Sequence, residues 1–367
     1  MKFRCERDTL ADAIGTAQRA VAARPGALPV LSGLRVSVAS SGGVELVGSD
    51  LELTIRAEAP AQVEGEGSAV VPARLFSDIV RKLESGSVTI EFGEDDAQIE
   101  SGRASFALRT LPAADFPRLP EVTGAGVRVT AGSLAEALRQ VVPAASRDDA
   151  RPILTGVLLT AVGGGLRLVA TDSYRLAVRD LQGVTQFLQE GQKVLVAGRG
   201  LGEVQRLLGD GEIEVVLSER EVVFRVGATE VTTRLIEGEF PNYEQLIPSG
   251  YPNRLTVSRD LIHAAVERVR LVGQGRDTAP IRLAMTSEGL ELSAVAQDVG
   301  EAHESVEAKY EGADLTVAFN SQFLLEGIEA AGASEVVIES IDPLKPAVLR
   351  GSDNADFLYL LMPVRIS

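Results

Sequence analysis

Short strands that lead directly into helical patterns recur three times along the chain. Residues 3–14, 127–138 and 255–266 form one series of such units, and residues 69–80, 194–204 and 315–325 form a second. In the first series a Thr, Ser or Asp stands at each junction and is expected to cap the helix. Apolar residues at i, i+4 and i+7 predict one buried stripe per helix. The three stripes are Leu10, Ile14 and Ala17; Leu134, Leu138 and Val141; and Ile262, Val266 and Val269.

Alternating strands lie between the helical patterns, for example at 87–92 and 212–217. Such alternation predicts antiparallel sheets with one buried face. Because the strand–helix units recur at about one third of the chain length, we expect three α+β domains, each with two helices on antiparallel sheets. Phe-Pro segments followed by polar, glycine-rich residues suit linkers. They place the domains at residues 1–123, 124–252 and 253–367.

Composition limits the class of protein. The 367 residues are 45% hydrophobic but only 4% aromatic, without Trp, so the cores must be aliphatic. The single cysteine, Cys5, excludes an internal disulfide, fits a reducing compartment and is expected in the core. No secretory signal and no apolar run of about 18 residues is found. We therefore expect a soluble, cytoplasmic protein without membrane contact.

Few residues offer catalytic or metal chemistry. The two histidines, His263 and His303, have no His or Cys partners at metal-ligand spacing. Residues 198–202 (Gly-Arg-Gly-Leu-Gly) follow a strand, but their spacing does not fit a dinucleotide-binding turn. A hydrolase or nucleotidyl transferase remains an alternative class for which no residue set is found. We expect no catalytic residues, no cofactor and no metal site.

Two distant stretches carry a family resemblance. Residues 169–177 read Val-Ala-Thr-Asp-Ser-Tyr-Arg-Leu-Ala, and residues 358–367 read Leu-Tyr-Leu-Leu-Met-Pro-Val-Arg-Ile-Ser. Together with residues 24–31, 110–117 and 238–243, they make the whole chain resemble the bacterial beta sliding clamps, the processivity subunits of DNA polymerase III. The resemblance implies a DNA-clamp fold and a non-catalytic homodimeric ring that encircles duplex DNA. It also implies replicative and other DNA polymerases and the clamp loader complex as partners.

An acidic protein must concentrate its basic residues to hold DNA, because affinity for phosphates comes from Lys and Arg. The formal charge is −16, but the six helical stretches together carry +4, which leaves −20 for the rest. Helices that line a ring would thus give a weakly basic hole without base-specific contacts. The alternative is that these arginines only lie on solvated helix faces. The residues expected to face DNA are Arg24, Arg74, Arg147, Arg151, Arg199 and Arg206.

The resemblance also implies one hydrophobic pocket per subunit, which receives a short peptide from each partner. Its matching residues are Leu154, Thr171, Ser173, Tyr174, Arg175, Leu176, Pro241, Leu246, Asn320, Phe323, Leu344, Leu360, Met362, Pro363 and Arg365. Arg175 and Arg365 are expected at the rim, where they would bind peptide carbonyls or an acidic group. Ser173 and Tyr174 replace the commoner Gly and His, which leaves the peptide preference open.

For the ring contact, the resemblance implies that an edge strand of the first domain meets the third domain of a second subunit. Such pairing would remove an exposed sheet edge. The matching residues are Leu83, Arg103, Phe106 and Leu108, opposite Leu271 and Val272. A repeat-built scaffold that binds only proteins remains the alternative, although it would not need the positive charge of the six helices.

Overall fold

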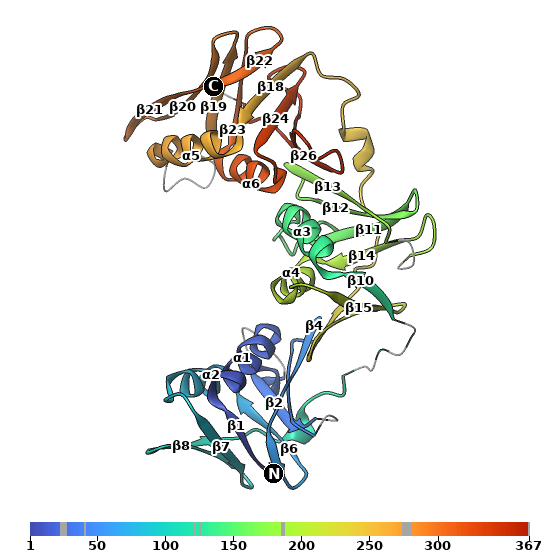
Figure 1. Cartoon of the computed structure of the whole chain (residues 1–367), viewed down its shortest axis with the longest axis vertical. Helices are drawn as coiled ribbons and strands as arrows, with labels where there is room; N and C mark the ends of the chain where they lie inside the picture. The colour runs from blue at the N-terminus through green and yellow to red at the C-terminus, as the bar shows by residue number, and fades with distance from the viewer. Residues whose placement is uncertain are drawn as a thin grey trace. The chain divides into compact units, whose positions relative to one another are not determined.

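A computed structural model describes residues 1–22, 28–39, 42–119, 122, 124, 126–184, 188–273 and 280–365. The chain, coloured by residue number in Figure 1, forms two compact units. Unit 1 comprises Met1–Gly132 and Glu203–Leu235, and unit 2 comprises Ser133–Gly202 and Ile236–Ser367. Helices α3 (Ala131–Val141) and α4 (Gly198–Leu207) each span a boundary between these segments.

Unit 1 contains two antiparallel sheets. The first has the order β5 (Gln62–Glu64), β1 (Lys2–Glu6), β7 (Ser87–Phe92), β8 (Asp96–Ser101) and β9 (Ala104–Arg109). The second has the order β10 (Val127–Thr130), β15 (Glu212–Leu217), β16 (Glu221–Val226), β17 (Thr229–Arg234), β4 (Leu53–Ala59), β3 (Val44–Ser49), β2 (Gly33–Val38) and β6 (Ser68–Pro72). The remaining elements are α1 (Arg7–Ala17), α2 (Ala73–Lys82), η1 (Gln18–Ala20), η2 (Pro29–Ser32) and η3 (Ala113–Asp115).

Unit 2 also contains two antiparallel sheets. The larger has the order β14 (Lys193–Ala197), β11 (Gly156–Val162), β12 (Gly165–Thr171), β13 (Arg175–Gln182), β26 (Phe357–Leu361), β25 (Ala347–Gly351), β24 (Glu335–Ser340), β18 (Asn253–Ser258) and β22 (Ala308–Glu311). The smaller has the order β21 (Gly300–Val306), β20 (Gly289–Ala296), β19 (Pro280–Thr286) and β23 (Leu315–Asn320). The remaining elements are α5 (Arg259–Val269), α6 (Ser321–Ala331), η4 (Val142–Ala144), η5 (Pro152–Thr155), η6 (Tyr243–Leu246) and η7 (Arg270–Gly273).

The predicted strand–helix units are confirmed. Each of the six α-helices follows directly on a strand, from β1–α1 to β23–α6. The nine residues of the three predicted stripes are all buried, from Leu10 in α1 to Val269 in α5. Helix formation and burial therefore follow from the 3.6-residue pattern.

Helix capping differs from the prediction. Glu6 and Ser258 precede α1 and α5, and neither makes a side-chain cap hydrogen bond. Backbone carbonyls of neighbouring turns accept the first helical amides instead: Arg7 donates to Gly86 at 2.8 Å, and Arg259 donates to Ser334 at 2.9 Å. At α1 and α5 a neighbouring turn thus supplies the acceptor for the first helical amide, in place of the predicted side-chain cap.

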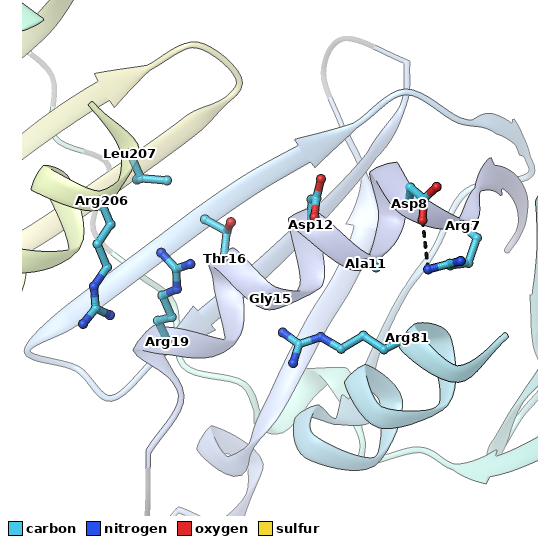
Figure 2. Close-up of a pocket in the computed structure, with 10 residues that line it drawn as sticks. All are labelled: Arg7, Asp8, Ala11, Asp12, Gly15, Thr16, Arg19, Arg81, Arg206 and Leu207. Atoms are coloured by element: carbon cyan, nitrogen blue, oxygen red, sulfur yellow. Dashed lines mark ion pairs between the residues drawn. The ribbon is translucent and has the colours of Figure 1, made fainter. Parts of the chain in front are cut away.

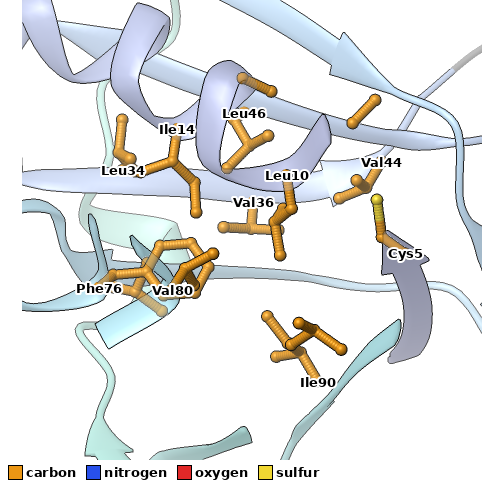
Figure 3. Packing of buried hydrophobic residues seen from close by; sticks show 14 of the residues in the cluster. Cys5, Leu10, Ile14, Leu34, Val36, Val44, Leu46, Phe76, Val80 and Ile90 are labelled. Carbon is orange, nitrogen blue, oxygen red and sulfur yellow. The ribbon is translucent and has the colours of Figure 1, made fainter. Parts of the chain in front are cut away.

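The core of unit 1 lies where its helices meet its sheets. Helices α1 and α2 lie side by side (Figure 2). Leu10 and Ile14 of α1 pack with Phe76 and Val80 of α2 against the aliphatic strand residues seen in Figure 3. Cys5 belongs to this cluster and is 4% exposed, which confirms its predicted place in the core.

Candidate partner pocket and nucleic-acid interface

Strand pairing joins the two stretches that the sequence singled out. β13 pairs with β26, with Leu176 opposite Leu360 and Arg175 opposite Leu361. Just beyond the paired residues, the amide of Met362 donates to the carbonyl of Tyr174 at 2.9 Å. The segments around residues 171–176 and 358–365 therefore form one continuous surface of unit 2.

The turn between β12 and β13, here called the pocket turn (residues 171–175), is held by its own side chains. Asp172 Oδ1 accepts from the amides of Tyr174 (2.9 Å) and Arg175 (3.0 Å). Thr171 Oγ1 accepts from the amide of Ser173 (3.2 Å) and donates to the carbonyl of Arg175 (2.6 Å). Ser173 has φ 82°, a left-handed conformation that glycine adopts at lower cost. The turn is thus rigid and carries local strain.

Arg175 has a different place from the one predicted. Its side chain is 8% exposed, and its guanidinium lies over the Phe323 ring, 4.2 Å from the centroid. It donates to Asp172 Oδ2 (3.0 Å), to Glu326 and to the carbonyl of Pro143 (2.5 Å). These acceptors belong to the chain itself, so Arg175 braces the pocket wall and is buried, whereas the prediction placed it at the rim.

Arg175 shares this network with the buried phenol of Tyr359. The Tyr359 hydroxyl donates to the carbonyl of Phe323 (3.0 Å) and accepts from Arg175 (3.4 Å). Burial raises the pKa of Tyr359 above its ordinary value, against the opposing effect of Arg175. Burial also acts to lower the pKa of Arg175, but Tyr359 and Glu326 more than offset it, and the pKa is raised. Both groups keep their protonated forms at neutral pH.

The floor of the surface is apolar. Leu176 and Leu360 belong to a buried cluster with Val169, Val348 and Tyr243. Beside it, Tyr174 is 60% exposed and stacks on Phe323 of α6 with ring centroids 6.5 Å apart. An exposed aromatic ring next to an aliphatic floor suits the anchoring of apolar peptide side chains.

The other predicted pocket residues border this surface to different degrees. Asn320 is buried and caps α6, since its Oδ1 accepts from the amides of Gln322 (2.9 Å) and Phe323 (3.2 Å). Leu154 and Pro363 are partly buried. The exposed residues of the set are Pro241, Leu246, Leu344, Met362 and Arg365. The structure therefore unites Thr171, Tyr174, Arg175, Leu176, Phe323, Leu360 and Met362 most directly.

A basic cavity of about 410 Å³ lies in unit 1 between α1, α2 and the last turn of α4. It is lined by Arg7, Asp8, Ala11, Asp12, Gly15, Thr16, Arg19, Arg81, Arg206 and Leu207 (Figure 2). Of these, Arg206 was predicted to face DNA, whereas the other three arginines were not singled out. The sequence could have pointed to them, because Arg7, Arg19 and Arg81 all lie in the predicted helical stretches whose summed charge is positive.

Ion pairs partly neutralise the arginines of this cavity. Glu203 lies 3.6 Å from Arg19 and 2.9 Å from Arg206, so one carboxylate holds two guanidinium groups. A Cβ atom at Gly15 would lie 2.9 Å from Arg81 Nη2, so this glycine leaves room for the Arg81 side chain over α1. Four arginines face two aspartates along the lining, which makes it attractive to phosphate.

The other arginines predicted to face DNA lie on exposed positions. Arg74 is in the first turn of α2, Arg199 is on α4, and Arg147 follows η4. Arg151 is exposed but bonded: its Nε lies 2.9 Å from Asp148, and its Nη1 donates to Ser173 Oγ at 3.3 Å. This bond ties a residue predicted to face DNA to the pocket turn. Arg24 lies outside the described residues.

The residues predicted for the ring contact divide into core and surface. β9 is an edge strand of its sheet, as predicted; Arg103, just before it, is exposed, and Phe106 within it is 39% exposed. Leu83 and Leu108 are buried in the core of unit 1. In unit 2, Leu271 is 54% exposed on η7, and Val272 is partly buried.

Within the described ranges, no group of three or more His, Cys, Asp or Glu side chains is placed to hold a metal ion. In the same part of the chain, no helix is long and apolar enough to cross a membrane.

Comparisons with known protein families cover most of the chain. Residues 1–120 match the N-terminal domain of the DNA polymerase III beta subunit, residues 128–242 match its central domain, and residues 244–365 match its C-terminal domain.

Individual proteins are similar over the full length. The chain is 36% identical to a beta sliding clamp of Streptomyces coelicolor, with 100% of both chains covered, and 32% identical to one of Staphylococcus epidermidis, with 100% and 99% covered. Among solved structures, the DNA polymerase sliding clamps of Bacillus subtilis (TM-score 0.90, 27% identity) and Pseudomonas aeruginosa (TM-score 0.88, 30% identity) are each covered completely, as is this chain.

Proposed function

The chain belongs to the DNA polymerase III beta subunit family, the beta sliding clamps, and from this premise we propose that two copies close into a ring that slides on duplex DNA and holds partner proteins by the pocket of β13, β26 and α6. It is a three-domain, non-catalytic processivity factor of DNA replication. The alternatives of an enzyme and of a scaffold without DNA are therefore set aside.

The observation that carries the DNA part of the proposal is the basic cavity of unit 1. The protein has a formal charge of −16, yet this cavity gathers Arg7, Arg19, Arg81 and Arg206 against two aspartates. Such a surface attracts DNA phosphates irrespective of the base sequence. The pairing of Arg19 and Arg206 with Glu203 weakens their hold on phosphate, which favours sliding over tight binding.

The partner part of the proposal depends on the pocket surface. Tyr174, Phe323 and Met362 offer exposed or half-buried apolar groups above the buried Leu176 and Leu360. Such a surface suits a short peptide with Leu or Phe anchors from a DNA polymerase or a clamp loader. Met362 adds a flexible side chain that adapts to different peptides.

Ring closure is proposed through sheet edges. β9 of unit 1 and β21 of unit 2 are both edge strands, and an exposed edge invites pairing with another chain. Arg103 stands just before β9 and Arg109 ends it, whereas β21 carries Glu301 and Glu304. A head-to-tail dimer would bring these opposite charges together and would bury Phe106.

The test of the proposal is retention on circular DNA. The protein is incubated with a bacterial clamp loader complex, ATP and a nicked circular plasmid, and the DNA is then isolated in moderately high salt. We expect the protein to stay on the circle and to be lost once the plasmid is linearised, because topology and not affinity holds it. Equal loss from both forms, or equal retention on both, would contradict the ring.

Two variants separate the parts of the proposal. Met362→Ala should weaken the binding of a polymerase-derived peptide without changing the mass of the dimer. Arg81→Glu should shorten retention on the circle and leave peptide binding unchanged, and Arg128→Glu, an exposed arginine outside the cavity, is its control. Equal peptide affinity in Met362→Ala and the parent would remove the pocket assignment.

A further inference from the structure

Two turns of the chain share the same uncommon backbone geometry. Leu51 has φ 77° and Ser173 has φ 82°, and within the described residues they are the two positions other than glycine with positive φ. The left-handed region is unfavourable for L-residues with a Cβ atom, and most of all for bulky ones. Since Ser173 lies in the pocket turn, Leu51 marks a second turn of the same design, here called the twin turn (residues 49–53).

The hydrogen bonds of the twin turn repeat those of the pocket turn. Asp50 Oδ1 accepts from the amides of Glu52 (3.1 Å) and Leu53 (2.8 Å). In the same way, the aspartate of the pocket turn accepts from the amides two and three residues after it. Ser49 Oγ accepts from the amide of Leu51 at 3.1 Å, in the role of the pocket-turn threonine. The two turns therefore correspond residue by residue.

The neighbouring strand repeats as well. β17 pairs with β4 after the twin turn as β26 pairs with β13 after the pocket turn. The amide of Arg234 donates to the carbonyl of Glu52 at 3.1 Å, and the amide of Met362 donates to the carbonyl of Tyr174 at 2.9 Å. Arg234 thus takes the place of the pocket methionine, and Glu52 takes the place of the pocket tyrosine.

A cavity of about 90 Å³ lies against the twin turn, within unit 1. It is lined by Leu51, Glu52, Thr54, Arg56, Arg118, Leu119, Glu221, Thr232 and Arg234. Three arginines against two glutamates make the lining positive in a chain with a charge of −16.

The three arginines of this lining differ in their ion pairs with carboxylates. Arg234 lies 3.3 Å from Glu52, and Arg56 lies 3.5 Å from Glu230. Arg118 is exposed, and over the described ranges no carboxylate lies within ion-pair distance of it. Leu51, 40% exposed, supplies an apolar side chain beside these charges.

We propose that the twin turn is a second docking site, for a partner peptide segment in which a carboxylate stands beside an aliphatic side chain. The carboxylate binds Arg118 and Arg234, and the aliphatic side chain packs on Leu51 and Leu119. The inference extends the proposed function, because it gives the clamp a second point of attachment that differs from the first in its demand for negative charge. Leu51 keeps a bulky side chain at a position where glycine would be less strained, which fits a side chain needed for contact.

The test uses a dye-labelled peptide, N-acetyl-Leu-Asp-Leu-Asp-Leu-amide, and fluorescence anisotropy with the full chain. All measurements are made in a Met362→Ala background, so that binding at the first pocket is weakened. We expect Arg118→Glu and Leu51→Gly each to lower affinity at least tenfold. Arg220→Glu, a matched charge reversal of an exposed arginine outside the lining, should leave affinity unchanged. Replacement of both aspartates of the peptide by asparagine should abolish binding.

Leu51→Gly keeps the test independent of folding, because glycine adopts φ 77° freely and the thermal midpoint should not fall. Equal peptide affinity in Leu51→Gly and its background would overturn the proposal. A second result would also overturn it: a single-stranded oligonucleotide displaces the peptide, and Arg118→Glu and Arg220→Glu lower peptide affinity equally. The surface would then be a general phosphate site. Neither result bears on retention on circular DNA, so failure of the second site and failure of the ring are distinguishable.

Discussion

The amide of Met362 donates a 2.9 Å hydrogen bond to the carbonyl of Tyr174 and so fixes the end of β26 against the pocket turn. This bond joins the backbones of two residues with exposed side chains, beside the strands that carry the buried Leu176 and Leu360. The pocket is therefore a product of sheet pairing, and residues that hold this pairing are as important for it as those that line it.

Arg175→Ala is expected to lower the free energy of unfolding of unit 2 by about 3 kcal/mol, because it leaves the buried Asp172 and the partly buried Glu326 without their cation. Arg167→Ala is the matched control on β12. It removes a partly exposed pair with Asp180 (2.7 Å) and should cost about 1 kcal/mol. Urea unfolding followed by circular dichroism measures both, and equal losses would contradict the bracing role of Arg175.

Ser173→Gly is expected to raise the thermal midpoint slightly. Glycine removes about 1 kcal/mol of strain at φ 82°, whereas the lost bond from Arg151 is exposed and long, 3.3 Å. Ser105→Gly, in the regular strand β9, should lower the midpoint instead, because glycine weakens a strand. Scanning calorimetry of the two variants decides the sign, and a fall in both would show that the Arg151 contact outweighs the strain.

Phe106→Ala is expected to weaken dimerisation by about 2 kcal/mol, roughly thirtyfold in Kd, if this exposed ring on β9 is buried in the ring contact. Sedimentation velocity at sub-micromolar concentration measures the change. Val162→Ala removes an equally exposed apolar side chain away from β9 and should have no effect. An unchanged mass distribution for Phe106→Ala would remove this residue from the interface.

Cys5 should react slowly with iodoacetamide at pH 8 in the folded protein and quickly in urea. Burial raises the pKa of its thiol, so the folded state holds less reactive thiolate at this pH. The pKa of the thiol in the folded state lies above its unfolded value of about 8.5. The contribution of the protonated thiol to folding stability is therefore present below about pH 8.5 and is lost as pH rises from there through the folded pKa. Mass spectrometry of the adduct measures the rate, and equal rates in both states would contradict the buried position.

The sequence alone was sufficient for the elements that depend on local pattern. The apolar stripes of Leu10, Leu134 and Ile262 lie in helices, because a 3.6-residue repeat of apolar residues has one stable way to be buried. Family resemblance also brought together the segments of Thr171 and Met362, which the strand pairing of β13 and β26 confirms. The proposed roles in DNA binding, peptide binding and ring closure remain predictions.

The tertiary structure decided what depends on long-range packing. Only burial shows that Arg175 braces the pocket wall, because the sequence does not reveal that Glu326 and Pro143 surround its guanidinium. The basic cavity likewise unites Arg7, Arg81 and Arg206 from three separate helices. The sequence repeats a hydroxyl residue followed by aspartate in the two turns, but the backbone angle that Leu51 and Ser173 share is seen only in the structure. A pattern along the chain records which side chains are apolar, whereas the partners of a buried charge and the sign of φ are fixed only when distant strands meet.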